Sequence, residues 1–121
     1  MKKEKYWFKA LEVSKIAKEC GALIPMETRL IKFESGEYFD FELRELISKF
    51  PKLLKAKNYT INPFLPADSN LLVEKIKSEY LIILNKYPVE KGHMLLITSE
   101  YKPQNGWLSK YDFETIEGIE E

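Results

Sequence analysis

The residues best suited to chemistry lie in one polar connection between two apolar runs. Leu81–Leu84 and Met94–Ile97 are short and rich in Ile and Leu, which predicts two neighbouring buried strands. Asn85 and Lys86 follow the first strand, where the backbone is rigid enough to aim a side chain and open enough to admit a ligand. A lysine in this position can donate hydrogen bonds and a positive charge to a phosphate. An ordinary hairpin with solvated polar residues is the alternative interpretation.

The single histidine, His93, lies in the same connection. Any nucleophilic or general-base histidine would have to be this residue. Because it directly precedes a predicted buried strand, its expected role is to fasten the loop by hydrogen bonds. One His and the single cysteine, Cys20, do not supply the roughly three or four ligands of a metal site. Phosphate-binding glycine loops and serine-nucleophile motifs are absent, so no metal and no cofactor are expected.

Composition restricts the class of protein and places any anion binding in a local site. The 121 residues are 45% hydrophobic and 31% charged, which predicts a single folded domain spanning residues 1–121. Because 19 basic residues balance 19 acidic ones, no overall field favours nucleic acid or an anionic membrane. The single cysteine, and the absence of a signal-peptide core or a membrane-length apolar run, predict a cytoplasmic protein without internal disulfides.

A basic stretch and a proline-rich loop precede the two central strands. Pro51 discourages one continuous helix over Leu46–Lys57. This stretch could approach an anionic ligand, and a solvated surface is the alternative. The loop Asn62–Asp68 is stiffened by two prolines around Phe64. The lysines of the basic stretch are Lys49, Lys52, Lys55 and Lys57.

The N-terminal third predicts a helix followed by a hairpin. Apolar residues recur every three or four positions over Lys5–Cys20, and Gly21 follows where a helix needs a left-handed cap. The hairpin is expected to pair Thr28–Phe33 with Tyr38–Leu43 around a turn at Ser35–Gly36. The helical stripe comprises Tyr6, Ala10, Val13, Ala17 and Cys20, widened by Trp7 and Leu11, and the second strand alternates at Phe39, Phe41 and Leu43.

The C-terminal segment predicts a second helix. Ser109 and Asp112 have the spacing of a capping box, after which Phe113, Ile116 and Ile119 form an apolar stripe. Acidic residues at its end oppose the helix dipole, so we expect this helix to continue or to meet another chain. The predicted fold class is α+β, an antiparallel sheet of hairpins with an N-terminal and a C-terminal helix. The strands are expected to pair antiparallel, because the connections between them are too short for crossover helices. A further short strand is expected at Leu71–Val73.

Several short motifs follow one another in a characteristic order along the chain. They are Gly21-Ala22-Leu23-Ile24-Pro25, Thr28, Asn62-Pro63-Phe64-Leu65-Pro66, Leu84-Asn85-Lys86-Tyr87-Pro88-Val89, His93-Met94-Leu95-Leu96-Ile97-Thr98, Tyr101, Gln104 and Asp112-Phe113. This order resembles the N-terminal part of ATP adenylyltransferases, also called diadenosine tetraphosphate phosphorylases, of the histidine-triad superfamily. The resemblance runs across nearly the whole chain and implies half of a histidine-triad-like fold.

The resemblance implies an enzyme that cleaves diadenosine tetraphosphate with phosphate, giving ATP and ADP through a nucleotidylated histidine. Asn85 and Lys86 would contact substrate, together with one of Lys55 and Lys57. The residues implied to order the loop or to wall the pocket are Asn62, Phe64, His93 and Gln104.

The family's nucleophile lies in a His-x-His-x-Gln segment after a Gly-Ala-Ser-Gln-like phosphate loop, and neither occurs in these 121 residues. We therefore expect the isolated chain not to turn over substrate. The implied partners are adenine nucleotides or dinucleoside polyphosphates, and either a separate C-terminal catalytic half or a second copy of the chain. Two alternatives are an inactive module that binds adenine nucleotides or polyphosphate, and a structural protein that self-associates.

Overall fold

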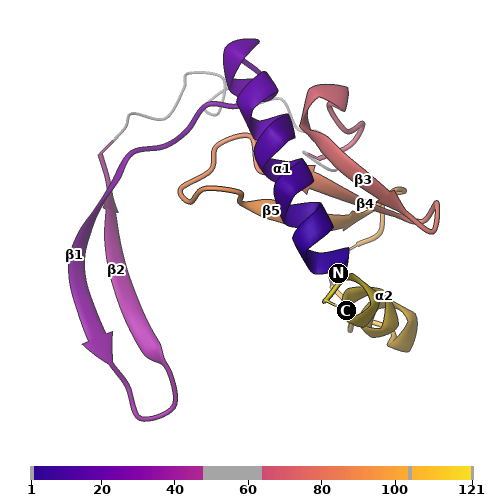
Figure 1. Cartoon of the computed structure of the whole chain (residues 1–121). Coiled ribbons are helices and arrows are strands. Elements are labelled where there is room, and N and C mark those ends of the chain that lie inside the picture. The colour runs from indigo at the N-terminus through magenta and orange to yellow at the C-terminus, as the bar shows by residue number, and fades with distance from the viewer. Residues whose placement is uncertain (1, 48–63, 104, 121) are drawn as a thin grey trace.

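Two helices and five strands make up the part of the chain that the computed structural model describes, which is residues 2–47, 64–103 and 105–120 (Figure 1). The arrangement is α+β with antiparallel strands, so the predicted fold class is confirmed. In chain order the elements are α1 (Lys2–Glu19), β1 (Thr28–Ser35), β2 (Asp40–Leu46), the short 3-10 turn η2 (Ser69–Leu71), β3 (Leu72–Ile76), β4 (Tyr80–Leu84), β5 (Met94–Thr98) and α2 (Lys110–Glu120).

Helix α1 forms where the apolar spacing predicted it. Ala10 and Ala17 are fully buried, and Gly21 takes the left-handed conformation with φ +81° directly after the helix. The prediction that Cys20 belongs to the buried stripe is wrong, because its side chain is exposed. The helix ends at Glu19, and the chain turns so that the amide of Ala22 donates to the carbonyl of Ala17 at 2.9 Å.

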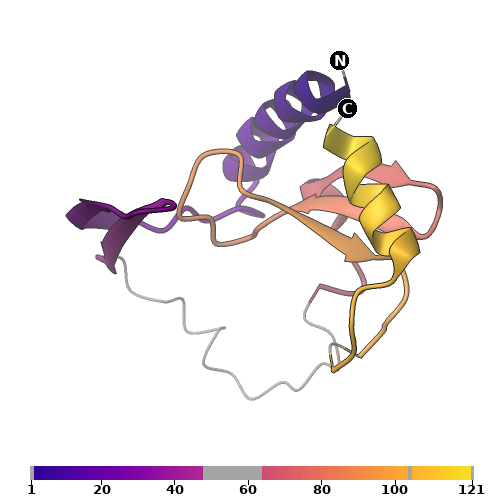
Figure 2. The same cartoon turned by 90° about the horizontal axis from the view of Figure 1, so that it is seen from below.

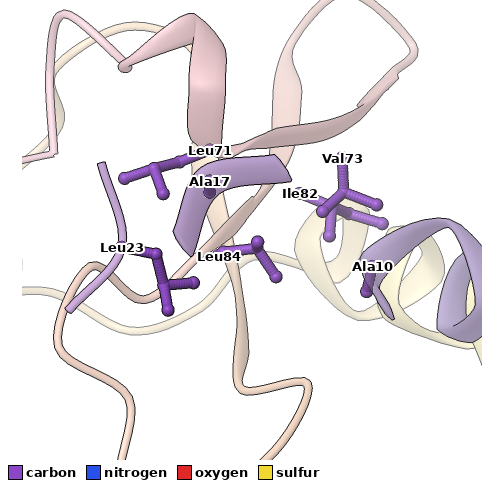
Figure 3. Packing of buried hydrophobic residues seen from close by; sticks show 7 residues of the cluster. All are labelled: Ala10, Ala17, Leu23, Leu71, Val73, Ile82 and Leu84. Carbon is purple, nitrogen blue, oxygen red and sulfur yellow. The ribbon is translucent and has the colours of Figure 1, made fainter. Parts of the chain in front are cut away.

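The three-stranded sheet β3-β4-β5 contains the core of the molecule. Strand β4 lies in the middle and pairs antiparallel with β5, from Tyr80 opposite Thr98 to Leu84 opposite Met94. The two apolar runs are therefore neighbouring strands, as predicted. Helix α1 crosses this sheet and closes the cluster shown in Figure 3. Its buried members are Ala10, Ala17, Leu23, Leu71, Val73, Ile82 and Leu84.

The hairpin β1–β2 forms a second sheet of its own and stands clear of the first (Figures 1 and 2). The sequence predicted one sheet built from both hairpins, and the structure has two. The turn also lies further along than predicted, since β1 runs to Ser35 and the amide of Gly36 donates to the carbonyl of Phe39 at 3.0 Å. The alternating side chains of β2 are exposed, because no helix or strand of the other sheet packs closely on them in the described structure.

Helix α2 begins at the predicted capping box, and its side chains fasten it to β4. The amide of Ser109 donates to Asp112 Oδ2 at 2.8 Å, and the amide of Asp112 donates to Ser109 Oγ at 3.1 Å. The predicted stripe is only partly right. Thr115 and Ile119 face the interior, whereas Phe113 is 54% exposed because it lies roughly 200° around the helix from Thr115.

Candidate functional site

The connection between β4 and β5, residues 85–93, is closed by Asn85 and His93. The amide of Asn85 donates to the carbonyl of His93 at 2.9 Å, and Asn85 Nδ2 lies 3.4 Å from His93 Nδ1. Asn85 Oδ1 also accepts from the amide of Tyr87 at 3.1 Å, a turn that asparagine favours. The polar atoms of Asn85 are thus used to hold the two ends of this loop together.

Lys86 is one of two exposed cations of this loop, the other being Lys91. It follows directly on Asn85, and its Nζ lies 5.7 Å from the ring centroid of Tyr87, near the limit of a cation–π contact. Its carbonyl accepts a hydrogen bond from the amide of Ile24 at 2.8 Å. The backbone of Lys86 is therefore fixed while its ammonium group is accessible to an anion.

The segment that follows α1 supports the loop from one side. The amide of Met26 donates to the carbonyl of Pro88 at 2.9 Å, one rung along from the bond between Ile24 and Lys86. Arg44 of β2 adds an ion pair to Glu90 at 3.6 Å. The base of the β1–β2 hairpin and the loop are thus one connected unit.

Trp7 of α1 supports the loop from the other side. Gly92 has φ +71°, and a Cβ built on it would lie 2.7 Å from Trp7 Cη2. Only glycine can combine this backbone conformation with such a close approach. Sequence reasoning did not connect these two residues, because neither spacing nor composition relates positions so far apart in the chain.

A cavity of about 690 Å³ lies between α1 and this loop. Its floor is apolar, with Leu23, Met26 and Leu84, and His93 lies in its wall. Among the described residues, Asn85 and Lys86 do not line it. The charged residues around it are Lys15, Lys18, Glu19, Glu90 and Lys91.

A second cavity of about 420 Å³ lies against β4, β5 and the start of α2. Phe64, Lys102 and Trp107 are part of its lining, with Tyr80 and Asp112 at its base. Burial raises the pKa of Tyr80 to about 12, helped by the hydrogen bond that its hydroxyl donates to Asp112. The same hydrogen bond is the main reason that the pKa of Asp112 is lowered.

The structure thus brings together three of the predicted site residues, Asn85, Lys86 and His93. It places Phe64 in a different cavity, which meets the central strand β4 at Tyr80, the opposite end from Leu84. The roles of all four in substrate binding stay predictions. The remaining predicted site residues, Lys55, Lys57, Asn62 and Gln104, lie outside the described residues, as does most of the basic stretch.

Metal ligands and membrane spans were also sought in the described ranges. No group of three or more His, Cys, Asp and Glu there could hold a metal ion. Neither described helix is long and apolar enough to cross a bilayer.

The fold and the loop together define a small α+β domain with a rigid, lysine-bearing turn beside its central strand. A family model described as "Ap4A phosphorylase N-terminal domain" matches residues 1–119. The chain belongs to this family, and the resemblance stated from the motifs is confirmed.

Relatives in yeast agree with this assignment. The chain is 40% identical over 61 residues to diadenosine 5',5'''-P1,P4-tetraphosphate phosphorylase 2 of Saccharomyces cerevisiae, which is 48% of this chain and 19% of that protein. The crystal structure of yeast Ap4A phosphorylase Apa2 with AMP matches at TM-score 0.71 and 26% identity, over 93% of this chain and 37% of that one. Apa2 with Ap4A matches at TM-score 0.66 and 26% identity, over 95% and 38%. The chain therefore spans well under half the length of these relatives.

Proposed function

We propose that these 121 residues supply the N-terminal, nucleotide-contacting portion of an enzyme that cleaves diadenosine tetraphosphate with phosphate to give ATP and ADP. The observation that carries the proposal is the fixed loop after β4, in which the Asn85 side chain is bound internally and the Lys86 ammonium group is exposed. Family membership and the AMP and Ap4A complexes of yeast Apa2 support it.

In this proposal Lys86 donates to a phosphate oxygen of the bound nucleotide. A compact ammonium group on a fixed backbone can follow a phosphate during the reaction without losing its charge. Asn85 holds the turn through its bonds to Tyr87 and His93, so its effect on binding passes mainly through the position of Lys86. The site is completed by residues that this part of the chain does not provide.

We do not assign the nucleophile to His93. Its Nδ1 faces the side-chain amide of Asn85. The 121 residues contain no second histidine that could form the family's His-x-His pattern. Covalent transfer of a nucleotidyl group requires an activated nucleophile. The chain alone is therefore expected to be inactive, and the reactive histidine is expected on another polypeptide or another part of the protein.

The test mixes the purified chain with a polypeptide containing the part of yeast Apa2 that follows the matched stretch, and follows ATP and ADP formation from diadenosine tetraphosphate and phosphate. We expect no turnover by either polypeptide alone and turnover by the mixture. Lys86→Met should lower the rate by about tenfold or more, since a charged hydrogen bond to phosphate is lost. Lys75→Met, on the exposed side of β3, is the matched control. No phosphorolysis at any ratio would count against the proposal.

A second candidate function is nucleotide binding without catalysis, favoured by the exposed Lys86 and by the lysines around the larger cavity. One exposed lysine contributes on the order of 1 kcal/mol against a phosphate, so the expected affinity is only millimolar. Calorimetry with ATP and with diadenosine tetraphosphate tests this function. No heat at millimolar ligand would exclude it.

A further inference from the structure

The β1–β2 hairpin, residues Thr28–Leu46 and here called the arm, is the least covered element of the described structure. Its strands pair only with each other among the described residues, and its side chains are exposed from Arg29 to Glu45. An isolated two-stranded hairpin is marginally stable in water and needs a further strand or another element against it. The arm therefore has the properties of a surface that is covered in the assembled protein.

One face of the arm has an apolar centre. Phe39, Phe41 and Leu43 lie on it with 64%, 54% and 55% of their surface exposed, and the rings of Phe39 and Phe41 are 4.8 Å apart. The register places Lys32 opposite Leu43 and Glu34 opposite Phe41. Clustered aromatic side chains of this exposure are unusual on the surface of a monomer and mark interaction sites.

Charged residues border this apolar centre and balance one another. Lys32 Nζ lies 2.9 Å from Glu34 Oε1, and Arg29 Nη2 lies 2.5 Å from Glu45 Oε2. An apolar centre with a polar rim is the common anatomy of a protein interface. Because the rim is neutral as a whole, it favours a polypeptide surface of mixed charge over a polyanion.

The opposite face of the arm is exposed as well. Leu30 and Phe33 are 48% and 59% exposed there. A partner that meets only one face would leave the other in water. Cover on both faces is what an element receives when it is inserted into a larger folded unit.

The base of the arm is joined to the loop that carries Lys86. The amide of Ile47 donates to the carbonyl of Glu27 at 2.8 Å and closes the arm. The neighbouring residues Ile24 and Met26 then bond to the carbonyls of Lys86 and Pro88. A polypeptide that covers the arm is thus held beside the proposed nucleotide site.

The relatives indicate what this polypeptide is. A match over 93% of the chain leaves out far fewer residues than the arm contains, so most of the arm belongs to the fold shared with yeast Apa2. In that structure the shared part is only 37% of the chain, so most of that polypeptide lies outside the match. We propose that the arm is the docking surface for the polypeptide that provides the remainder of the family fold. This inference rests on the proposed function, because it concerns the same assembled site.

The experiment measures association of the full 121-residue chain with the same remaining part of yeast Apa2, by co-purification after co-expression and by sedimentation. The test variant is Phe41→Thr with Leu43→Thr, which removes two of the three apolar side chains of this centre and keeps strand propensity. We expect its affinity to fall at least about tenfold, or about 1.4 kcal/mol at 25 °C. The control is Phe8→Thr, an aromatic residue of α1 that is 66% exposed and lies outside the arm, which should associate like the wild type.

Folding of the isolated variant is checked by circular dichroism, and hydrogen exchange of the arm amides gives a second readout. In the wild type, association should slow exchange in β1 and β2, and the test variant should not show this protection. Equal association of wild type and test variant overturns the proposal, as does the absence of any association. A dimer of the isolated chain that the test variant abolishes also overturns it, because the occupant would then be a second copy.

The two proposals fail in different ways. Phosphorolysis restored equally by wild type and test variant would leave the proposed function standing and remove the arm as the docking surface. Association that depends on the arm but gives no phosphorolysis would do the reverse.

Discussion

The hydroxyl of Tyr80 donates to Asp112 Oδ1 at 2.5 Å and links the central strand β4 to the first turn of α2. Tyr80 is buried and Asp112 is half-buried, so the bond lies at the edge of the core. The other oxygen of the same carboxylate, Oδ2, accepts a hydrogen bond from the backbone amide of Ser109. One side chain therefore both caps a helix and attaches it to the sheet.

Replacing Tyr80 with Phe should destabilise the protein by about 1 kcal/mol at neutral pH, the usual net value of one hydrogen bond. The raised pKa adds an alkaline effect. Stability from this group is fully present below its ordinary pKa of about 10 and is lost as pH rises through about 12. Denaturant unfolding between pH 9 and 12 measures both effects. The gap between wild type and Tyr80→Phe should narrow over this range, and a constant gap would contradict the assignment.

Asp112 should make the free energy of unfolding depend on pH in the acid range. Its pKa is lowered, first by the hydrogen bond from Tyr80 and then by the amide of Ser109. Stability from this carboxylate is present above its ordinary pKa of 3.8 and is lost as pH falls through the lowered value in the folded state. Asp112→Asn removes this dependence. The difference in the free energy of unfolding between this variant and the wild type should therefore shrink as the pH falls, in denaturant titrations. Glu117→Gln, on the same helix, is the control.

Substitutions at three glycines distinguish the cost of backbone strain from the cost of a steric clash. Gly106→Ala should change stability by less than about 0.5 kcal/mol, since nothing lies within 4 Å of its Cβ position. Gly21→Ala should cost about 1 kcal/mol, since its φ of +81° is strained but its surroundings are open. Gly92→Ala should cost more than either, roughly 2–4 kcal/mol, because strain and the clash with Trp7 combine.

The contact itself is tested by a double variant. If Trp7 causes the excess cost at Gly92, Trp7→Ala with Gly92→Ala should be more stable than the sum of the single effects predicts. Simple additivity in thermal unfolding would contradict this contact.

The loop closure at Asn85 is tested by exchange rates. Asn85→Ala removes the acceptor for the Tyr87 amide and the contact with His93, so the Tyr87 amide should exchange faster. His93→Phe keeps a ring in place but loses Nδ1, and it should affect exchange less. An unchanged Tyr87 amide in Asn85→Ala would show that the side chain does not hold the turn.

Local patterns predicted much of this fold. The strands on either side of Asn85, the left-handed Gly21 and the reciprocal bonds of Ser109 with Asp112 each depend on residues close together in sequence. Residue types and spacing are enough to specify such features. The resemblance to the family was also carried by short ordered motifs.

Long-range relationships could not be predicted. The ion pair of Lys9 with Glu74, at 3.0 Å across 65 positions, has no signal in sequence. Likewise, the alternation at Phe41 and Leu43 correctly indicated a strand. Alternation does not tell whether the apolar face of that strand packs on the same sheet, on another element or on another polypeptide. Exposure of these side chains became evident only when the arm was seen apart from the sheet.

The two tryptophans differ sharply in environment, and this gives the protein its own optical reporter. Trp107 is fully exposed, whereas Trp7 lies against Gly92 in the loop beside the larger cavity. Trp107→Phe would leave a single indole whose emission wavelength and quenching respond to the β4–β5 loop. Nucleotide titrations could then be read by fluorescence without any attached dye.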